Sequence, residues 1–208
     1  MRYVERSVGI CALVLVLACG SAFAADYRLV PASPDVEAGE TISLTVEVVT
    51  QSGDNLVGSG HFAFAIDLSF NGTAEVGPDA ISALLLNQTV FSDVESGFLG
   101  TIDGSQLKGV GGASLDAFGP NAGASVGDIV QLFSFSLSVP AAAPLGSTIT
   151  ITPSEGRLQN VTVNDMLDRV SPQTFSSTNL VVIPEPASLV LLAAASLLAR
   201  RRRRAARD

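Results

Sequence analysis

The sequence predicts an all-β protein whose body is a single antiparallel β-sandwich, with a short apolar segment at each end of the chain. Two observations lead to this fold class. Apolar and polar residues alternate with a period of two in four segments, and Gly, Pro, Asn and Asp cluster between those segments. Alternation on one face indicates antiparallel sheets with the other face in water, as in a sandwich or jelly roll. The length of 208 residues fits one such domain.

Each of the four segments has one apolar face. In residues 41–48 this face holds Ile42, Leu44, Val46 and Val48. In residues 61–70 it holds Phe62, Phe64, Ile66, Leu68 and Phe70, while His61, Asp67 and Ser69 face outward. In residues 133–139 and 148–152 it holds Phe133, Phe135, Leu137, Val139, Ile149 and Ile151, which alternate with Ser and Thr. We expect these faces to meet in one core.

Helix is scarce in the predicted body. Between Asp79 and Asn87, the residues Ile81, Leu84 and Leu85 have the i, i+3, i+4 spacing of one or two helical turns. No repeat of 20–50 residues is present, which argues against a solenoid or a propeller.

Charge is distributed unevenly along the chain. The net charge is −8, yet residues 25–183 contain 17 acidic side chains and only four basic ones. Those four are Arg28, Lys108, Arg157 and Arg169. A body this acidic repels phosphate backbones, so nucleic acid is excluded as a partner.

The N-terminus has the three parts of a secretory signal peptide. A positively charged flank precedes a short apolar core, and the small residues Ala22 and Ala24 predict cleavage after Ala24. Two alternatives stay open: an uncleaved membrane anchor, and a lipoprotein acylated at Cys19. Both cysteines, Cys11 and Cys19, lie in this segment. Cleavage would therefore leave no thiol for a disulfide, a metal site or a nucleophile.

The C-terminus combines a short motif, an apolar run and a basic cluster. The motif is Pro184-Glu185-Pro186, and the apolar run extends from Leu189 to Ala199. The prolines fix φ and remove N–H donors, so the motif is expected to be extended. The apolar run enters the bilayer, and a basic cluster stops transfer. The stop-transfer residues are Arg200, Arg201, Arg202, Arg203 and Arg204.

This arrangement over residues 184–208 resembles the PEP-CTERM sorting signal of bacterial surface proteins. The resemblance implies recognition by an exosortase-type membrane enzyme, cleavage near Pro184-Glu185-Pro186, and release or attachment at the surface of a Gram-negative bacterium that makes exopolysaccharide. The apolar run, about 13 residues counted from Ala187, spans only about 20 Å. That length suits a transient signal better than a permanent anchor. An ordinary tail anchor is the alternative.

The order of the predicted strands resembles the cohesin-like module, a jelly-roll sandwich related in fold to several carbohydrate-binding modules. The resemblance is carried by residues 36–42, by residues 60–70 with the Asn71-Gly72 turn, and by residues 127–139 with 144–149. It covers most of the chain from Asp26 to Val163. The duplicated calcium segment of a dockerin is absent, and the resemblance does not name a binding partner.

Residues suited to catalysis or metal binding are few. His61 is the only histidine, and no Gly-x-Ser-x-Gly motif accompanies it. Asp93 with Glu95, or Asp103 with Asp116, are candidate carboxylate pairs for a glycosidase, although solvated loop acids are the simpler interpretation. Asn164, Asp165 and Asp168 form only a fragment of a calcium loop. We therefore predict no enzyme activity and no cofactor, with structural calcium as a minor alternative.

Ligand contacts are expected from exposed aromatic rings, because sugar rings stack on aromatic faces. The candidates are Phe91, Phe98 and Phe118, each in a Gly-, Asp- or Ser-rich segment, and core anchoring is the competing interpretation for each. Ser- and Thr-rich strands are a weaker alternative, through hydrogen bonds to glycan hydroxyls.

Four parts of the chain are predicted from these patterns. They are a signal peptide (1–24), a cohesin-like sandwich (25–170), a Ser/Thr-rich linker with the last strand (171–183), and the sorting signal (184–208). The predicted function is non-catalytic adhesion at the cell surface or in the extracellular matrix, to a polysaccharide or a surface protein, after passage through the inner membrane. A carbohydrate-binding module proper and a small secreted hydrolase are the alternatives.

Overall fold

The structure is a computed structural model that describes residues 24–57, 61–87, 91, 98–113, 125–156, 163–164 and 170–185. The side chains of residues 61, 62, 98, 163 and 164 are outside this description. The described residues form twelve β-strands and one short 3-10 helix, η1 (Pro78–Ala80). The strands are β1 (Ala25–Pro31), β2 (Asp35–Glu37), β3 (Thr41–Val49), β4 (His61–Gly72), β5 (Ile81–Leu86), β6 (Phe98–Asp103), β7 (Gln106–Ala113), β8 (Ile129–Ser138), β9 (Thr148–Glu155), β10 (Val163–Asn164), β11 (Gln173–Ser176) and β12 (Thr178–Ile183).

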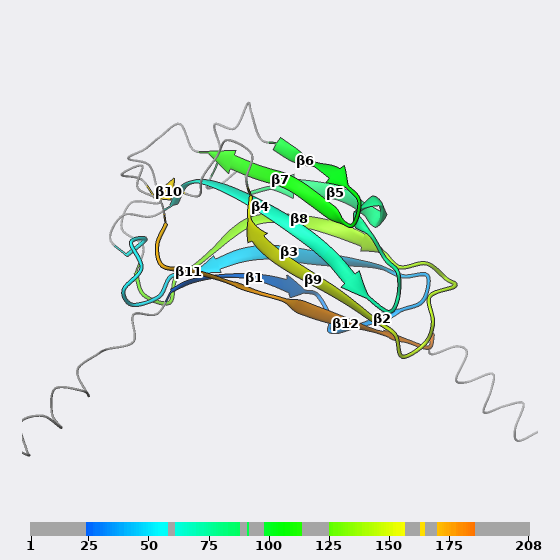
Figure 1. Cartoon of the computed structure of the whole chain (residues 1–208). Helices are drawn as coiled ribbons and strands as arrows, with labels where there is room; N and C mark the ends of the chain where they lie inside the picture. Colours follow the sequence, from blue (N-terminus) through cyan, green and yellow to red (C-terminus); the bar gives the residue numbers. More distant parts are fainter. Residues whose placement is uncertain are drawn as a thin grey trace, which may run out of the picture.

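Two sheets face each other, which confirms the predicted all-β sandwich (Figure 1). The first sheet has five strands in the order β11-β1-β3-β8-β5. The second has seven, in the order β2-β12-β9-β4-β7-β6, with β10 paired to β4. Most neighbours are antiparallel, but β1 with β11 and β12 with β2 are parallel pairs.

The core between the sheets is made by the apolar faces that the alternation predicts. Ile42, Leu44, Val46 and Val48 of β3 are all buried, as are the inward residues of β8 and β9. On β4, Phe64, Ile66, Leu68 and Phe70 are buried. The Phe64 and Phe133 rings stack across the two sheets with centroids 6.0 Å apart. Aromatic contact thus links the two sheets within the core.

The prediction of a helix between Asp79 and Asn87 is wrong. Within that range only Asp79 and Ala80 are helical, as part of the single turn of η1. Residues 81–86 form β5, which pairs antiparallel with β8. The register shifts between Ser82 and Leu85, and Ala83 between them has φ +49°. This bulge turns Ile81, Leu84 and Leu86 toward the core and leaves Leu85 65% exposed. A bulge in a strand therefore produced the helix-like spacing.

The Ser/Thr-rich stretch from Ser171 to Thr178, expected to be a linker, lies in the sandwich instead. Its residues 173–176 form β11, which pairs in parallel with β1. The chain then crosses to the other sheet, where β12 pairs with β9 and β2. The N-terminal segment makes the same crossing from β1 to β2. We call these two side-by-side segments, residues 25–37 and 173–183, the crossing pair.

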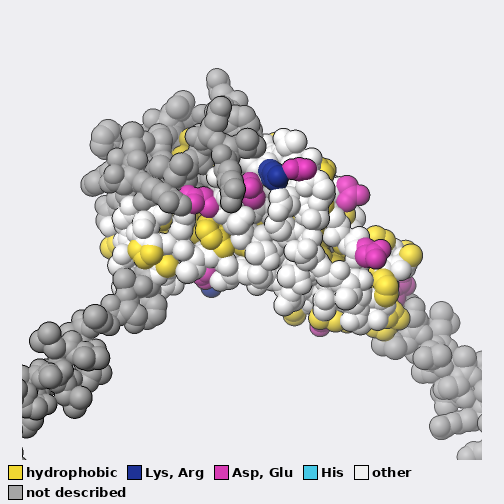
Figure 2. All heavy atoms as spheres, in the orientation of Figure 1, with side chains coloured by type: hydrophobic (Ala, Val, Ile, Leu, Met, Phe, Trp, Pro, Cys, Tyr) yellow, Lys and Arg dark blue, Asp and Glu magenta, His cyan; other side chains and the backbone are white. Residues whose placement is uncertain are grey.

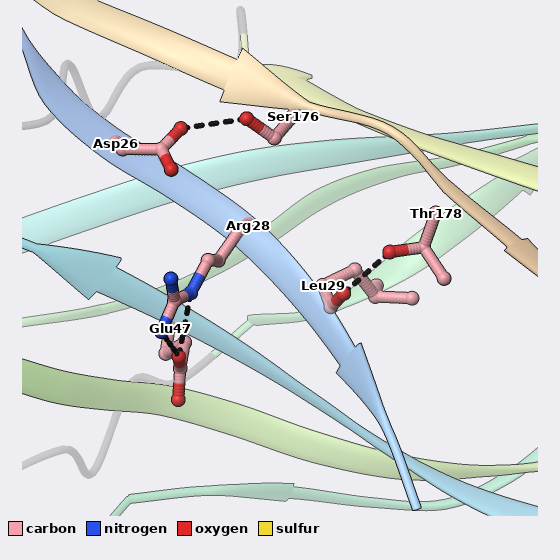
Figure 3. A network of polar contacts seen from close by, with 6 residues as sticks. All are labelled: Asp26, Arg28, Leu29, Glu47, Ser176 and Thr178. Carbon is pink, nitrogen blue, oxygen red and sulfur yellow. Dashed lines mark hydrogen bonds and ion pairs between the residues drawn. The ribbon is translucent and has the colours of Figure 1, made fainter. Parts of the chain in front are cut away.

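Polar contacts hold the crossing pair together on its solvent side (Figure 3). The Asp26 carboxylate accepts hydrogen bonds from the hydroxyls of Ser176 (2.7 Å) and Thr174 (3.2 Å). The Thr178 hydroxyl donates to the Leu29 carbonyl. The first two bonds lie beside the paired part of β1 and β11, and the bond from Thr178 lies where the chain leaves β11 for β12. The Ser and Thr content that suggested a linker thus serves the crossing.

The two ends of the sandwich are defined by the crossing pair. β1 begins at one end of the molecule and β12 ends at the opposite one (Figure 1). At the end where β12 stops, the connection from β8 to β9 lies against it: the Gly146 N–H donates to the Val182 carbonyl (2.8 Å), and the Val182 N–H donates to the Ser147 carbonyl (2.9 Å). We call this the C-terminal end of the sandwich.

Candidate functional site

The first two residues of the Pro184-Glu185-Pro186 motif follow the last strand with no intervening residue. Ile183 is still paired with Glu37 of β2. Pro184 is half-buried and Glu185 is exposed. Pro186 and the whole of residues 187–208, including Arg200–Arg204, lie outside the described residues. At the other terminus Ala24 is the first described residue, and Ala22 lies outside. The part of the chain that is described contains no helix long and apolar enough to cross a membrane.

Phe91 is a core residue and not a ligand contact. Its side chain is fully buried, and its ring meets the Phe64 ring edge-on with centroids 4.9 Å apart. A ring in this position has no free face to offer a sugar. The Phe98 side chain and all of Phe118 lie outside the described residues, so these two predictions stay open.

Of the carboxylates singled out in the sequence as candidate pairs, Asp103 alone lies in the described part of the chain, so neither pair is tested by the structure. Asp103, on exposed β6, forms an ion pair with Lys108 of β7. The hydrogen bond and the positive charge of Lys108 lower the pKa of the Asp103 carboxyl below its ordinary value. Such a group stays ionised and cannot serve as a proton donor near neutral pH. Asp93, Glu95 and Asp116 lie outside the described residues.

Metal binding finds no support in the described part of the chain. It holds no group of three or more His, Cys, Asp and Glu side chains placed to bind an ion. The side chains of His61 and Asn164, together with Asp165 and Asp168, are outside the description. Asp54, an almost buried carboxylate, serves the backbone instead: it accepts from the N–H groups of Gln51 (2.6 Å) and Leu56 (3.0 Å).

The outer faces of both sheets are polar, and many of their hydroxyls bond one another across strands. Thr150 donates to Asn179 (2.7 Å), while Thr152 and Ser177 are 3.0 Å apart. On the five-stranded sheet, Thr41 and Ser138 form the same kind of contact at 3.0 Å. Hydroxyls already engaged with neighbours gain less from a glycan. The weak glycan-binding mode predicted for Ser- and Thr-rich strands stays a prediction.

Both basic side chains in the described residues are paired with carboxylates. Arg28 contacts Glu47 through two nitrogens, Nε at 2.8 Å and a terminal nitrogen at 2.7 Å from the same oxygen (Figure 3). Lys108 pairs with Asp103. Several other carboxylates, among them Asp35, Glu40, Glu75, Asp79 and Asp128, are exposed. On the face in Figure 2, the acidic side chains are scattered rather than gathered into a pocket.

Two structural features escaped the sequence reasoning. One is the pairing within the crossing pair. The last strand predicted within residues 171–183 is β12, with Leu180 and Val182 buried, but its parallel pairing with β2 and the parallel pairing of β11 with β1 were not predicted. The other is the connection Pro140–Ser147, which contains no charged residue and reaches the C-terminal end of the sandwich. Its low charge was visible in the sequence, but its place beside β12 depends on tertiary contacts.

Comparison with solved structures identifies the fold as cohesin-like. The cohesin CaCohA2, in a complex with CaDoc0917, aligns with a TM-score of 0.55 and 12% identity over 76% of this chain and 99% of that chain. The third cohesin of ScaC from Acetivibrio cellulolyticus, in complex with the ScaB dockerin, aligns with a TM-score of 0.49 and 13% identity. This alignment covers 76% of this chain and 97% of that chain. A type III cohesin module of the cell-surface anchoring scaffoldin ScaE from Ruminococcus flavefaciens aligns with a TM-score of 0.49 and 11% identity. This alignment covers 88% of this chain and 96% of that chain.

The sequence itself matches no protein-family profile and no curated protein at a significant level. At 12% identity, the similarity to CaCohA2 concerns the fold alone. It confirms the cohesin-like, jelly-roll sandwich expected from the order of the strands.

Proposed function

We propose that this chain is an exported, non-catalytic binding module that is sorted to the bacterial cell surface or extracellular matrix through its C-terminal segment. The observation that carries the proposal is the cohesin-like fold, because the cohesin CaCohA2 is found in a complex with another protein.

The partner is proposed to be a protein with a basic surface. Residues 25–183 have 17 acidic and four basic side chains, and the two described basic ones are each paired with a carboxylate. A complementary partner therefore supplies the positive charge. Association driven by such complementarity slows as salt screens it, since the Debye length is about 10 Å at 0.1 M. In this proposal the exopolysaccharide surrounds the two proteins in the matrix, and the ligand of the module is the partner protein.

Binding is tested with the purified exported chain and the extracellular matrix of the producing bacterium. We expect binding to disappear after protease treatment of the matrix, to survive depolymerisation of its polysaccharide, and to weaken as ionic strength rises. Binding that survives protease but not depolymerisation would support a carbohydrate-binding module instead. Release of sugar fragments by the purified chain would contradict a non-catalytic role.

Sorting is proposed to depend on an exosortase-type enzyme that recognises Pro184-Glu185-Pro186. The support is its position, because an extended motif directly after the last strand is presented by the folded body rather than by a loose linker. In the producing bacterium, mass spectrometry of the surface form is expected to find a C-terminus near this motif. The variant Glu185→Gln should accumulate uncleaved in the inner membrane, whereas Glu75→Gln, a change at another exposed glutamate, should be processed normally. An intact wild-type chain resident in the inner membrane would overturn the sorting proposal.

A further inference from the structure

The distance between the folded body and the apolar run is short. β12 stays paired with β2 through Ile183, and the apolar run begins at Leu189. Five residues lie between them, and at about 3.3 Å per extended residue they span at most about 17 Å. If the apolar run enters a bilayer, as the proposed function requires, the C-terminal end of the sandwich is brought to the bilayer surface.

The connection between β8 and β9 gives that end an apolar part. The connection Pro140–Ser147 reads Pro-Ala-Ala-Ala-Pro-Leu-Gly-Ser and carries no charge. Its Leu145 side chain is 61% exposed, and Ala141, Ala142 and Pro144 are exposed as well. Figure 2 shows hydrophobic side chains, with acidic ones among them, at the end of the body where β12 stops in Figure 1. Exposed apolar groups placed together in this way favour an interface.

The connection is held against the strand that leads to the tail. Two backbone hydrogen bonds join it to Val182: the Gly146 N–H donates to the Val182 carbonyl (2.8 Å), and the Val182 N–H donates to the Ser147 carbonyl (2.9 Å). The side chain of Ala143 within the connection is buried. Gly39 of the neighbouring turn approaches Ala141: a Cβ on Gly39 would lie 3.6 Å from the Ala141 Cβ. Leu145 therefore keeps its position relative to the point where the chain leaves the sandwich.

We infer that the C-terminal end of the sandwich, led by Leu145 in the Pro140–Ser147 connection, docks into the lipid headgroup layer while the tail is inserted. The inference rests on the proposed membrane insertion of the tail. The ligand is the bilayer interface, into which exposed leucine and alanine side chains partition. Glu37, Glu40 and Glu185 stand at the same end, so zwitterionic lipids are preferred over anionic ones.

Site-specific fluorescence tests this contact in the chain that begins at Ala25, the form expected after signal cleavage. This form contains no cysteine, so an introduced cysteine is the only thiol. One variant carries Leu145→Cys, and the matched control carries Val126→Cys, a residue 58% exposed just before the opposite end of β8. Each is labelled with an environment-sensitive dye and reconstituted into zwitterionic vesicles that contain a headgroup nitroxide quencher.

We expect the dye at residue 145 to lose most of its fluorescence and the dye at residue 126 to keep it. Insertion of twelve Gly/Ser residues between Ile183 and Pro184, a flexible spacer of about 20 Å, should abolish the quenching while the protein still floats with the vesicles. Vesicles rich in anionic lipid should give weaker quenching at low salt, restored as salt is added.

The outcomes separate the two proposals. A chain that floats with vesicles but shows no quenching at residue 145 would overturn the docking inference and leave the membrane insertion standing. A chain that does not float would overturn both. Quenching seen only in membranes of the producing bacterium, and not in pure lipid, would assign this surface to a protein in those membranes and overturn the lipid contact.

Discussion

Gly72, the last residue of β4, is the glycine at which an added side chain would make the closest steric clash of those compared. Its φ is +127°, and a Cβ built there would lie 2.2 Å from the Thr148 carbonyl oxygen. Gly104, in the turn between β6 and β7, also has a positive φ of +58°, yet nothing lies within 4 Å of its Cβ position. A comparison of substitutions at Gly72 and Gly104 therefore distinguishes the cost of backbone strain from the cost of a steric clash.

Gly72→Ala is expected to lower the free energy of unfolding by about 3 kcal/mol or more, because strain and overlap with backbone add. Gly104→Ala should cost only about 1–2 kcal/mol, the strain of the left-handed region alone. Urea unfolding of both variants measures the difference. Equal losses would show that the backbone of β4 and β9 relaxes without cost around a methyl group added at Gly72.

Tyr27 is a second residue whose environment has a measurable effect. Its ring is fully buried and stacks on Phe175 with centroids 5.1 Å apart. Burial raises the pKa of its phenol well above 10, and the negative charges of Asp54 and Glu155 raise it further. Ionisation is therefore opposed in the folded chain but not in the unfolded one.

The free energy of unfolding should fall as pH rises above about 10, because the unfolded chain then loses the phenol proton that the folded chain retains. Below that pH both states keep the proton, and the contribution of Tyr27 to the free energy of unfolding is fully present. Tyr27→Phe should remove most of this alkaline slope, and comparison of slopes avoids any difference in stability at neutral pH. Urea midpoints measured from pH 7 to pH 11 provide the test; an unchanged slope in the variant would assign the alkaline loss to other groups.

Among the elements, β12 connects the crossing pair to the seven-stranded sheet. It joins β2 to the seven-stranded sheet and pairs on its other side with β9. Its residues alternate strictly, with Leu180 and Val182 buried and Val181 between them 37% exposed. A strand flanked on both sides and buried on one face behaves as an interior strand.

Leu180→Ala is expected to cost about 2–5 kcal/mol, the range for a large apolar side chain removed from a core. Val181→Ala, one position away in the same strand, should cost less than about 1 kcal/mol because its side chain is partly in water. Thermal unfolding of the two variants measures the contrast. Similar costs at both positions would mean that β12 contributes through its backbone pairing rather than through the core.

The elements also show how far sequence patterns reach. Alternation identified the inner faces of β3, β4, β8 and β9, because a period of two survives wherever a strand is regular. It failed at β5, where the bulge at Ala83 changes the period, and at β11, whose Ser and Thr residues suited a linker equally well. Phe91 could not be assigned because its burial comes from Phe64, a residue distant in sequence. The position of the sorting motif at the end of β12 likewise required the tertiary fold.

At the scale of the whole molecule, the crossing pair extends the folded unit to Ile183. The predicted boundary at residue 170 would remove β11 and β12, and with β12 the one strand that pairs with β2 among the described residues. It would also expose the apolar side chains that Leu180 and Val182 cover. The domain is therefore a single unit of residues 25–183, to which the C-terminal segment is directly attached.

A chain that ends at Glu185 is expected to unfold at the same denaturant concentration, and with the same steepness, as the full-length chain. A chain that ends at Val170 should lose the cooperative transition, because both sheets are then left with an unpaired interior edge. Urea unfolding followed by Tyr27 fluorescence and by circular dichroism provides the measurement. A cooperative transition in the shorter chain would place the domain boundary before the crossing pair.

The parallel pairing of β1 with β11 has a consequence for the order of events during synthesis. Ala25 is aligned with Gln173, so the first strand to be made waits for one of the last before its outer edge is satisfied. Contacts this remote along the chain slow folding, since a long loop must close before they form. Until the ribosome has delivered residue 183, the nascent polypeptide therefore keeps open β edges, and it depends on chaperones or on a narrow channel to keep those edges from joining other chains.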